Sequence, residues 1–199
     1  MKNITYLLRY ASREDWTPNL SLPRLGYPVP RGARTEAFVH HTVGLDNDAS
    51  PNIWETDAEC FARMRYLQRI RPDLGLDVPY SEVAFPMYKN GWPALLICEG
   101  RGPDRTGAHT SGHNISGYAV AVDGDWENYP GSFAPWAGEL GQFFGWRKYK
   151  QGPFNLQGMK NLGSICPSLN RHVFGHRDVY PTACPGKNIY NDLDKLIVS

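Results

Sequence analysis

The sequence has almost no surplus of charge of either sign and no long hydrophobic run. Its 199 residues include 21 Lys and Arg against 20 Asp and Glu, which gives a formal net charge of +1. This balance argues against the basic surface that binding to nucleic acid or to an anionic membrane requires. Apolar runs such as Ala94 to Cys98 reach only the length of a strand, whereas a membrane-spanning helix needs ~18 residues or more. We therefore expect a protein that neither binds nucleic acid nor inserts into a membrane.

We also expect neither an export signal nor a disulfide framework. Charged residues interrupt the N-terminal segment from Arg9 onward, so it contains no sustained apolar stretch of the kind found in secretory signals. The four cysteines follow no framework spacing and are Cys60, Cys98, Cys166 and Cys184. Without an export signal, such cysteines are expected to be thiols or metal ligands rather than disulfides.

Length and composition predict one domain preceded by an arm. Gly (20) and Pro (16) together make about 18% of the chain, against about 12% in an average protein, and aromatic residues reach 13%, which argues against disorder. Residues 17–36 are rich in proline and glycine, which break regular structure. We therefore divide the chain into a Pro-rich arm over residues 1–36 and a domain over residues 37–199, and we expect a monomer.

The alternation of strand and helix patterns predicts an α/β domain with a mixed central β-sheet flanked by helices. Short apolar runs predict strands over 37–42, 80–85, 94–98, 117–122 and 172–174. Between the second and third of these, Asn90 and Gly91 both tolerate positive φ and predict a hairpin. Helices are expected after residue 56, within 135–162 and over 189–197.

The first of these helices has the clearest signals. Thr56 and Glu59 have the spacing of a capping box, in which each side chain satisfies a free backbone amide at the start of a helix. Apolar residues then recur on one helical face at Ala58, Phe61, Met64 and Leu67. We expect this face to pack into the core.

His40, His176 and Cys184 are side chains of the types that bind zinc. Two imidazoles, one thiolate and a water are a ligand set typical of a catalytic zinc ion. The strand over 37–42 would place His40 at its end, and the Pro- and Gly-rich loop after residue 175 would turn the other two toward it. Spacing alone leaves the alternative open, because hydrogen-bonded core histidines and a buried thiol would fit it equally well.

Four segments in order resemble a known family. They are Phe38 to Thr42, Asp77 to Tyr80, Glu99 to Asn114 (which contains Gly-Ala-His-Thr), and Gly175 to Gly186. Together they resemble the type 2 N-acetylmuramoyl-L-alanine amidases, a family that includes the peptidoglycan recognition proteins and small phage endolysins. The resemblance spans roughly residues 36 to 198.

This resemblance implies a peptidoglycan-recognition-protein-like amidase fold and a zinc-dependent hydrolase. Its substrate would be bacterial peptidoglycan, cleaved at the amide between the lactyl group of N-acetylmuramic acid and L-alanine. By position, His40, His176 and Cys184 would bind Zn²⁺. Zinc lowers the pKa of bound water from 15.7 to roughly 7 and polarises a carbonyl, so no strong protein base is needed.

The resemblance also implies catalytic roles for Tyr80, His109 and Thr182. Tyr80 would be the tyrosine beside the metal, and His109 would support the site from the substrate side. Thr182 stands where several phage enzymes have a catalytic lysine, and a neutral hydroxyl cannot supply the same charge. The partner of the developing oxyanion is therefore open between Tyr80 and His109.

Other residues are interpreted as structural. His41 follows His40 in a strand and must face the opposite side of the sheet, which favours packing or support over ligation. His113 and His172 are taken as structural, Cys60 and Cys98 as core residues. The tryptophans Trp92, Trp126, Trp136 and Trp146 are each expected in the core rather than on a sugar-binding surface.

The expected setting is a bacteriolytic, antimicrobial phage endolysin that stays in the host cytoplasm until a partner such as a holin releases it to the cell wall. Two alternatives stay open. One is a non-catalytic peptidoglycan-binding module, although such modules typically lack the cysteine ligand. The other is a cysteine peptidase with Cys184 as nucleophile, although the following Pro185 has no backbone amide to offer an oxyanion.

Overall fold

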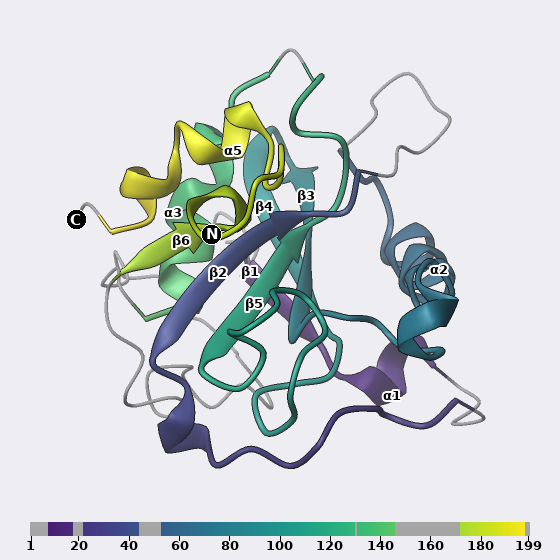
Figure 1. Cartoon of the computed structure of the whole chain (residues 1–199). Coiled ribbons are helices and arrows are strands. Elements are labelled where there is room, and N and C mark those ends of the chain that lie inside the picture. The colour runs from purple at the N-terminus through teal and green to yellow at the C-terminus, as the bar shows by residue number, and fades with distance from the viewer. Residues whose placement is uncertain (1–7, 18–21, 44–52, 130, 146–171, 198–199) are drawn as a thin grey trace.

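A mixed β-sheet forms the centre of the fold (Figure 1). The computed structural model describes residues 8–17, 22–43, 53–129, 131–145 and 172–197. Within them the sheet has six strands in the order β1-β4-β3-β5-β2-β6, of which β3 and β4 are antiparallel and all other neighbours are parallel. The strands are β1 (Leu8–Ala11), β2 (Glu36–His41), β3 (Glu82–Lys89), β4 (Trp92–Glu99), β5 (Gly117–Val122) and β6 (Val173–Gly175). The predicted mixed α/β sheet is confirmed.

Helices cover both faces of this sheet. They are α1 (Arg13–Trp16), α2 (Asp57–Leu67), α3 (Ala134–Phe143) and α5 (Lys187–Tyr190), with short 3-10 helices at Arg31–Ala33, Pro72–Leu74, His176–Asp178 and Leu193–Leu196. Figure 1 shows α3 and α5 on one side of the sheet and α2 on the other. In the described part of the chain, no helix combines the length and apolar character needed to cross a bilayer.

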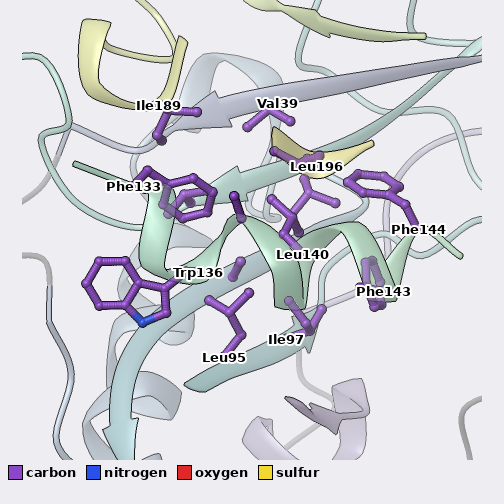
Figure 2. Close-up of a cluster of buried hydrophobic side chains, with 14 of the residues drawn as sticks. Val39, Leu95, Ile97, Phe133, Trp136, Leu140, Phe143, Phe144, Ile189 and Leu196 are labelled. Carbon is purple, nitrogen blue, oxygen red and sulfur yellow. The ribbon is translucent and has the colours of Figure 1, made fainter. Parts of the chain in front are cut away.

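The core on the α3 side is built from aromatic and aliphatic side chains (Figure 2). Trp136 and Leu140 of α3 pack in one buried cluster with Leu95 and Ile97 of β4 and with Val39 of β2. Each such side chain contributes roughly 1.5–3 kcal/mol when fully buried. The predicted core positions of Trp126 and Trp136 are confirmed. The same prediction is wrong for Trp92, which is 68% exposed beside the hairpin turn. Trp146 lies outside the described residues.

The core on the opposite face contains α2. Thr56 and Glu59 form the predicted capping box, each side chain accepting from the other residue's backbone N–H. Met64 and Leu67 are buried and Phe61 packs against the same cluster, which confirms the predicted face at these three positions. The prediction is wrong for Ala58, which is exposed, and the core position next to it is taken by Cys60.

The predicted hairpin is also confirmed. Asn90 (φ 53°) and Gly91 (φ 78°) both adopt positive φ between β3 and β4, which suits the twist of the two strands. The predicted continuous helix over 189–197 is wrong, because the chain leaves α5 at Asn191 and re-enters a 3-10 helix at Leu193. Between them, the Asp192 carboxylate accepts from Ser132 Oγ at 2.7 Å, which ties the bend to the start of α3.

The N-terminal segment contributes directly to the sheet. β1 pairs in parallel with β4, and the indole N–H of the buried Trp16 donates to the Glu99 carbonyl at 2.8 Å. The sequence pattern did not indicate this strand, because it is only four residues long and its two middle residues are half-buried. The division at residue 36 stays a prediction, but residues 8–16 pack as part of the domain.

Candidate functional site

Three possible metal ligands from distant parts of the chain meet where β2 and β6 end. β6 pairs in parallel with β2, with Gly175 opposite Val39. His176, which directly follows β6, therefore lies beside His40 of β2. Their ring centroids are 4.7 Å apart. One ligand atom each from His40, His176 and Cys184 lies within 4.8 Å of the other two. The structure thus brings together the three residues predicted to bind zinc.

Cys184 is held in place by the backbone of its own loop. The Arg177 N–H donates to the Cys184 carbonyl at 2.9 Å, and the Cys184 N–H donates to Thr182 Oγ1 at 3.2 Å. The Cys184 thiol then lies 3.4 Å from His40 Nδ1. Thr182 is half-buried, and its hydroxyl oxygen is engaged in holding this loop.

The electrostatics of these three groups suit a divalent cation. Burial lowers the pKa of His40 well below its usual range and also lowers that of His176, so both imidazoles are in the neutral form that binds metals. Burial raises the pKa of the Cys184 thiol to about 12. A thiol in that environment ionises at neutral pH only when a cation lies beside it. The donor set therefore fits zinc, which would provide that charge.

Tyr80 and His109 lie beside the same cluster. The Tyr80 ring centroid is 5.2 Å from that of His40, and burial, followed by the nearby Cys184, raises the Tyr80 pKa above its usual range. The His109 ring is 5.3 Å from His40, and burial lowers its pKa to about 3. A Cβ at Gly107 would lie 2.2 Å from His109 Cδ2, so the glycine leaves room for this ring. Both side chains are therefore neutral hydrogen-bonding groups.

A cleft of about 440 Å³ opens next to the cluster. Its volume is in the range of pockets that take small organic ligands. It is lined by Arg71, Leu74, Ala108, His109, Thr110, Ser111, Asn114, His176 and Tyr180. Because His176 belongs to both the cleft and the cluster, and His109 lines the cleft beside the cluster, a ligand in the cleft would reach the metal position.

The residues interpreted as structural keep that interpretation. His41 faces the α3 side of the sheet, where its Nδ1 accepts from the Trp126 N–H at 3.3 Å. His113 lies 3.1 Å from a Glu36 carboxylate oxygen, outside the cluster. Cys60 and Cys98 are buried free thiols, and Cys166 lies outside the described residues.

Sequence reasoning missed two groups that support the site. Thr110 Oγ1 lies between the rings of His40 and His109, and the only signal for it was its place directly after His109 in the third motif. Asp123, at the end of β5, accepts from Thr42 Oγ1 at 2.6 Å and from Arg63 Nε at 3.1 Å. No pattern in the sequence pointed to Asp123, because its partners Thr42, directly after β2, and Arg63, on α2, are far from it along the chain.

Sequence comparisons identify relatives of two kinds. The chain is 29% identical over 181 residues to an N-acetylmuramoyl-L-alanine amidase of Mus musculus, covering 85% of this chain but only 28% of the mouse protein. It is 27% identical over 161 residues to peptidoglycan-recognition protein SC1a of Drosophila melanogaster, covering 79% of this chain and 70% of that protein. No family model matches the chain.

Solved structures show the same fold. A Drosophila PGRP-LB variant in complex with tracheal cytotoxin matches with a TM-score of 0.59 and 22% identity over 94% of this chain and 93% of that chain. Human PGRP-IBETAC in complex with glycosamyl muramyl pentapeptide matches with a TM-score of 0.58 and 21% identity over 93% and 94%. The amidase LysC from Clostridium intestinale matches with a TM-score of 0.56 and 18% identity over 98% and 100%.

The solved structures agree with the mixed sheet described above. Together with the sequence relatives, they confirm the resemblance to the type 2 N-acetylmuramoyl-L-alanine amidases and peptidoglycan recognition proteins, and with it the predicted fold.

Proposed function

We propose that this chain is a zinc-dependent N-acetylmuramoyl-L-alanine amidase that acts on bacterial peptidoglycan. The observation that carries the proposal is the meeting of His40, His176 and Cys184, whose ligand atoms lie within 4.8 Å of one another beside the cleft. A relative named as this amidase supports the reaction. Neighbours solved with tracheal cytotoxin or a muramyl pentapeptide support the class of substrate.

Different side chains of the protein would bind the metal, donate a hydrogen bond to the substrate and hold the ligand loop. His40, His176 and Cys184 would hold the ion, and zinc, when bound, supplies Lewis acidity toward the scissile carbonyl and toward water. Tyr80 keeps its phenolic proton because its pKa is raised, so it can donate a hydrogen bond to the oxygen on which negative charge develops. The Thr182 oxygen already accepts from the Cys184 N–H, which suits a role in holding the ligand loop.

The decisive experiment combines metal analysis with product analysis. Purified peptidoglycan treated with the protein should gain free L-alanine amino termini and muramic acid lactyl carboxylates, as read by mass spectrometry. A chelator should stop this release and added zinc should restore it. Cys184→Ser should lose both zinc and activity while its circular dichroism spectrum stays unchanged.

A matched pair of histidine variants sharpens this test. His176→Asn should lose zinc, whereas His172→Asn, at an exposed histidine four residues away and outside the cluster, should keep it. Full activity in a chelated sample would contradict the zinc mechanism. Zinc and muropeptide binding without new termini would favour the non-catalytic module. Inactivation by alkylation but not by chelation would favour the cysteine peptidase.

We place the activity in bacteriolysis by a phage endolysin that stays in the host cytoplasm until lysis. This setting is supported by the amidase resemblance. Bacteria expressing the chain should keep their turbidity until a membrane-permeabilising agent is added, and then lyse. Cells expressing Cys184→Ser should stay intact after the same treatment. Equal turbidity in both cultures after permeabilisation would contradict this setting.

A further inference from the structure

We propose that Thr110 is a positioning residue whose hydroxyl sets the ring orientation and the tautomer of both His40 and His109. Thr110 Oγ1 lies 3.3 Å from His40 Nε2 and 2.9 Å from His109 Nδ1. All three side chains are buried, with exposed fractions of 2%, 1% and 8% for Thr110, His40 and His109. The two ring nitrogens, His40 Nε2 and His109 Nδ1, therefore face the Thr110 hydroxyl directly. The part of the inference that concerns the metal rests on the proposed function.

The direction of the two hydrogen bonds follows from the position of Cys184. Its sulfur lies 3.4 Å from His40 Nδ1, so Nδ1 is the nitrogen on the side of the ligand cluster. A nitrogen that binds a metal carries no proton, and a neutral imidazole has one proton, which must then be on Nε2. His40 Nε2–H therefore donates to Thr110 Oγ1.

The second hydrogen bond follows from the first. A hydroxyl has a single proton, and the Thr110 oxygen already accepts from His40, so its proton is free to be donated. The only ring nitrogen of His109 within reach is Nδ1, at 2.9 Å. Thr110 therefore donates to His109 Nδ1, and neutral His109 carries its own proton on Nε2. One hydroxyl thus sets both tautomers.

The loop that carries Thr110 is held firmly enough for this role. Asn114 Oδ1 accepts from the backbone N–H groups of His109 at 2.8 Å and of Thr110 at 3.1 Å. The buried Arg34 guanidinium donates to the Asn114 carbonyl at 3.1 Å. Because Thr110 and Asn114 also line the cleft, the wall of the cleft and a metal ligand are joined through one side chain. Groups that orient a ligand in this way typically change metal affinity 10–100-fold when removed, an order-of-magnitude range.

The test compares Thr110→Val, which removes the hydroxyl at nearly constant volume, with Thr110→Ser, which keeps it. Thr35→Val is the matched control, because Thr35 is exposed and outside the cleft. Zinc affinity is measured by competition with a chromophoric chelator. Tautomers are read from ¹⁵N-labelled histidine by long-range proton–nitrogen NMR. We expect Thr110→Val to weaken zinc binding by roughly 10–100-fold, with Thr110→Ser and Thr35→Val close to wild type.

The NMR measurement separates this inference from the proposed function. In the wild-type protein, we expect the proton on Nε2 in both His40 and His109, with or without added zinc, and a mixture of His109 tautomers in Thr110→Val. A His109 proton on Nδ1 in the wild type would overturn the inference, as would unchanged zinc affinity and tautomers in Thr110→Val. A chain that binds no zinc but shows these tautomers would refute the proposed function and leave the role of Thr110 supported.

Discussion

Replacing Arg34 should destabilise one wall of the cleft. Its guanidinium group is fully buried, at 0% exposure, and donates to main-chain carbonyls of the segment between β4 and β5 and of Gly117, the first residue of β5. These carbonyls belong to Pro103, Arg105, Asn114, Ile115 and Gly117. The same segment carries His109 and Thr110, so one side chain supports the whole wall.

The size of the effect can be worked from these contacts. A hydrogen bond to a charged group contributes about 1.5–3 kcal/mol, but the cost of burying the guanidinium opposes the sum. The Asn114 carbonyl also keeps a second donor, the Gly107 N–H at 3.2 Å. We therefore expect Arg34→Met to lower the free energy of unfolding by about 3–5 kcal/mol, because each buried carbonyl left without a donor costs about 1–3 kcal/mol and the avoided burial of the guanidinium offsets part of that sum. Arg34→Lys should lower the free energy of unfolding by an intermediate amount, because all the donors of a lysine are on one nitrogen and cannot reach the carbonyls that the planar guanidinium spans.

Urea unfolding measures this change, and amide hydrogen exchange locates it. Protection should fall mainly over residues 100–117 in Arg34→Met, while the amides of β3 and β4 keep theirs until global unfolding. Arg31→Met is the control, because Arg31 is exposed, and it should change stability by less than about 0.5 kcal/mol. An Arg34→Met protein within about 1 kcal/mol of wild type, with unchanged exchange, would refute the reasoning.

Two further predictions concern buried carboxyl groups. Burial, together with Glu99 on the neighbouring strand, raises the pKa of Glu82 well above 4.5, so the folded protein keeps a proton that the unfolded chain has lost. The free energy of unfolding should therefore fall as pH rises above 4.5, by up to about 1.4 kcal/mol per pH unit. In urea unfolding from pH 5 to 8, Glu82→Gln should remove this contribution to the pH dependence. The same pH dependence in wild type and Glu82→Gln would contradict this prediction. Asp123→Asn should cost about 3 kcal/mol in the same assay, because Arg63 loses its buried partner. Asp73→Asn, in an exposed pair with Arg71, should cost no more than about 0.5 kcal/mol, and equal losses in the two variants would argue against the buried pair.

Local signals in the sequence predicted much of the fold. The capping box at Thr56, the reversal at Asn90 and Gly91, and the apolar run of β5 depend on neighbouring residues only, and all are found in the structure. β1 escaped notice because a four-residue strand shows little pattern until it is paired with β4. The bend between α5 and the last 3-10 helix depends on a distant contact, the one from Asp192 to Ser132.

The sequence by itself determined the chemical types at the site, two imidazoles and a thiol in motifs of a recognisable order. Only the tertiary structure decided which atoms of those groups meet. Whether His40 turns Nδ1 or Nε2 toward Cys184 depends on a hydroxyl 70 residues away in the chain, and the wall that carries this hydroxyl depends on the buried Arg34. The physical reason is that hydrogen bonds and burial are properties of positions in space, and parallel strand pairing brings together residues whose separation along the chain carries no sign of their contact.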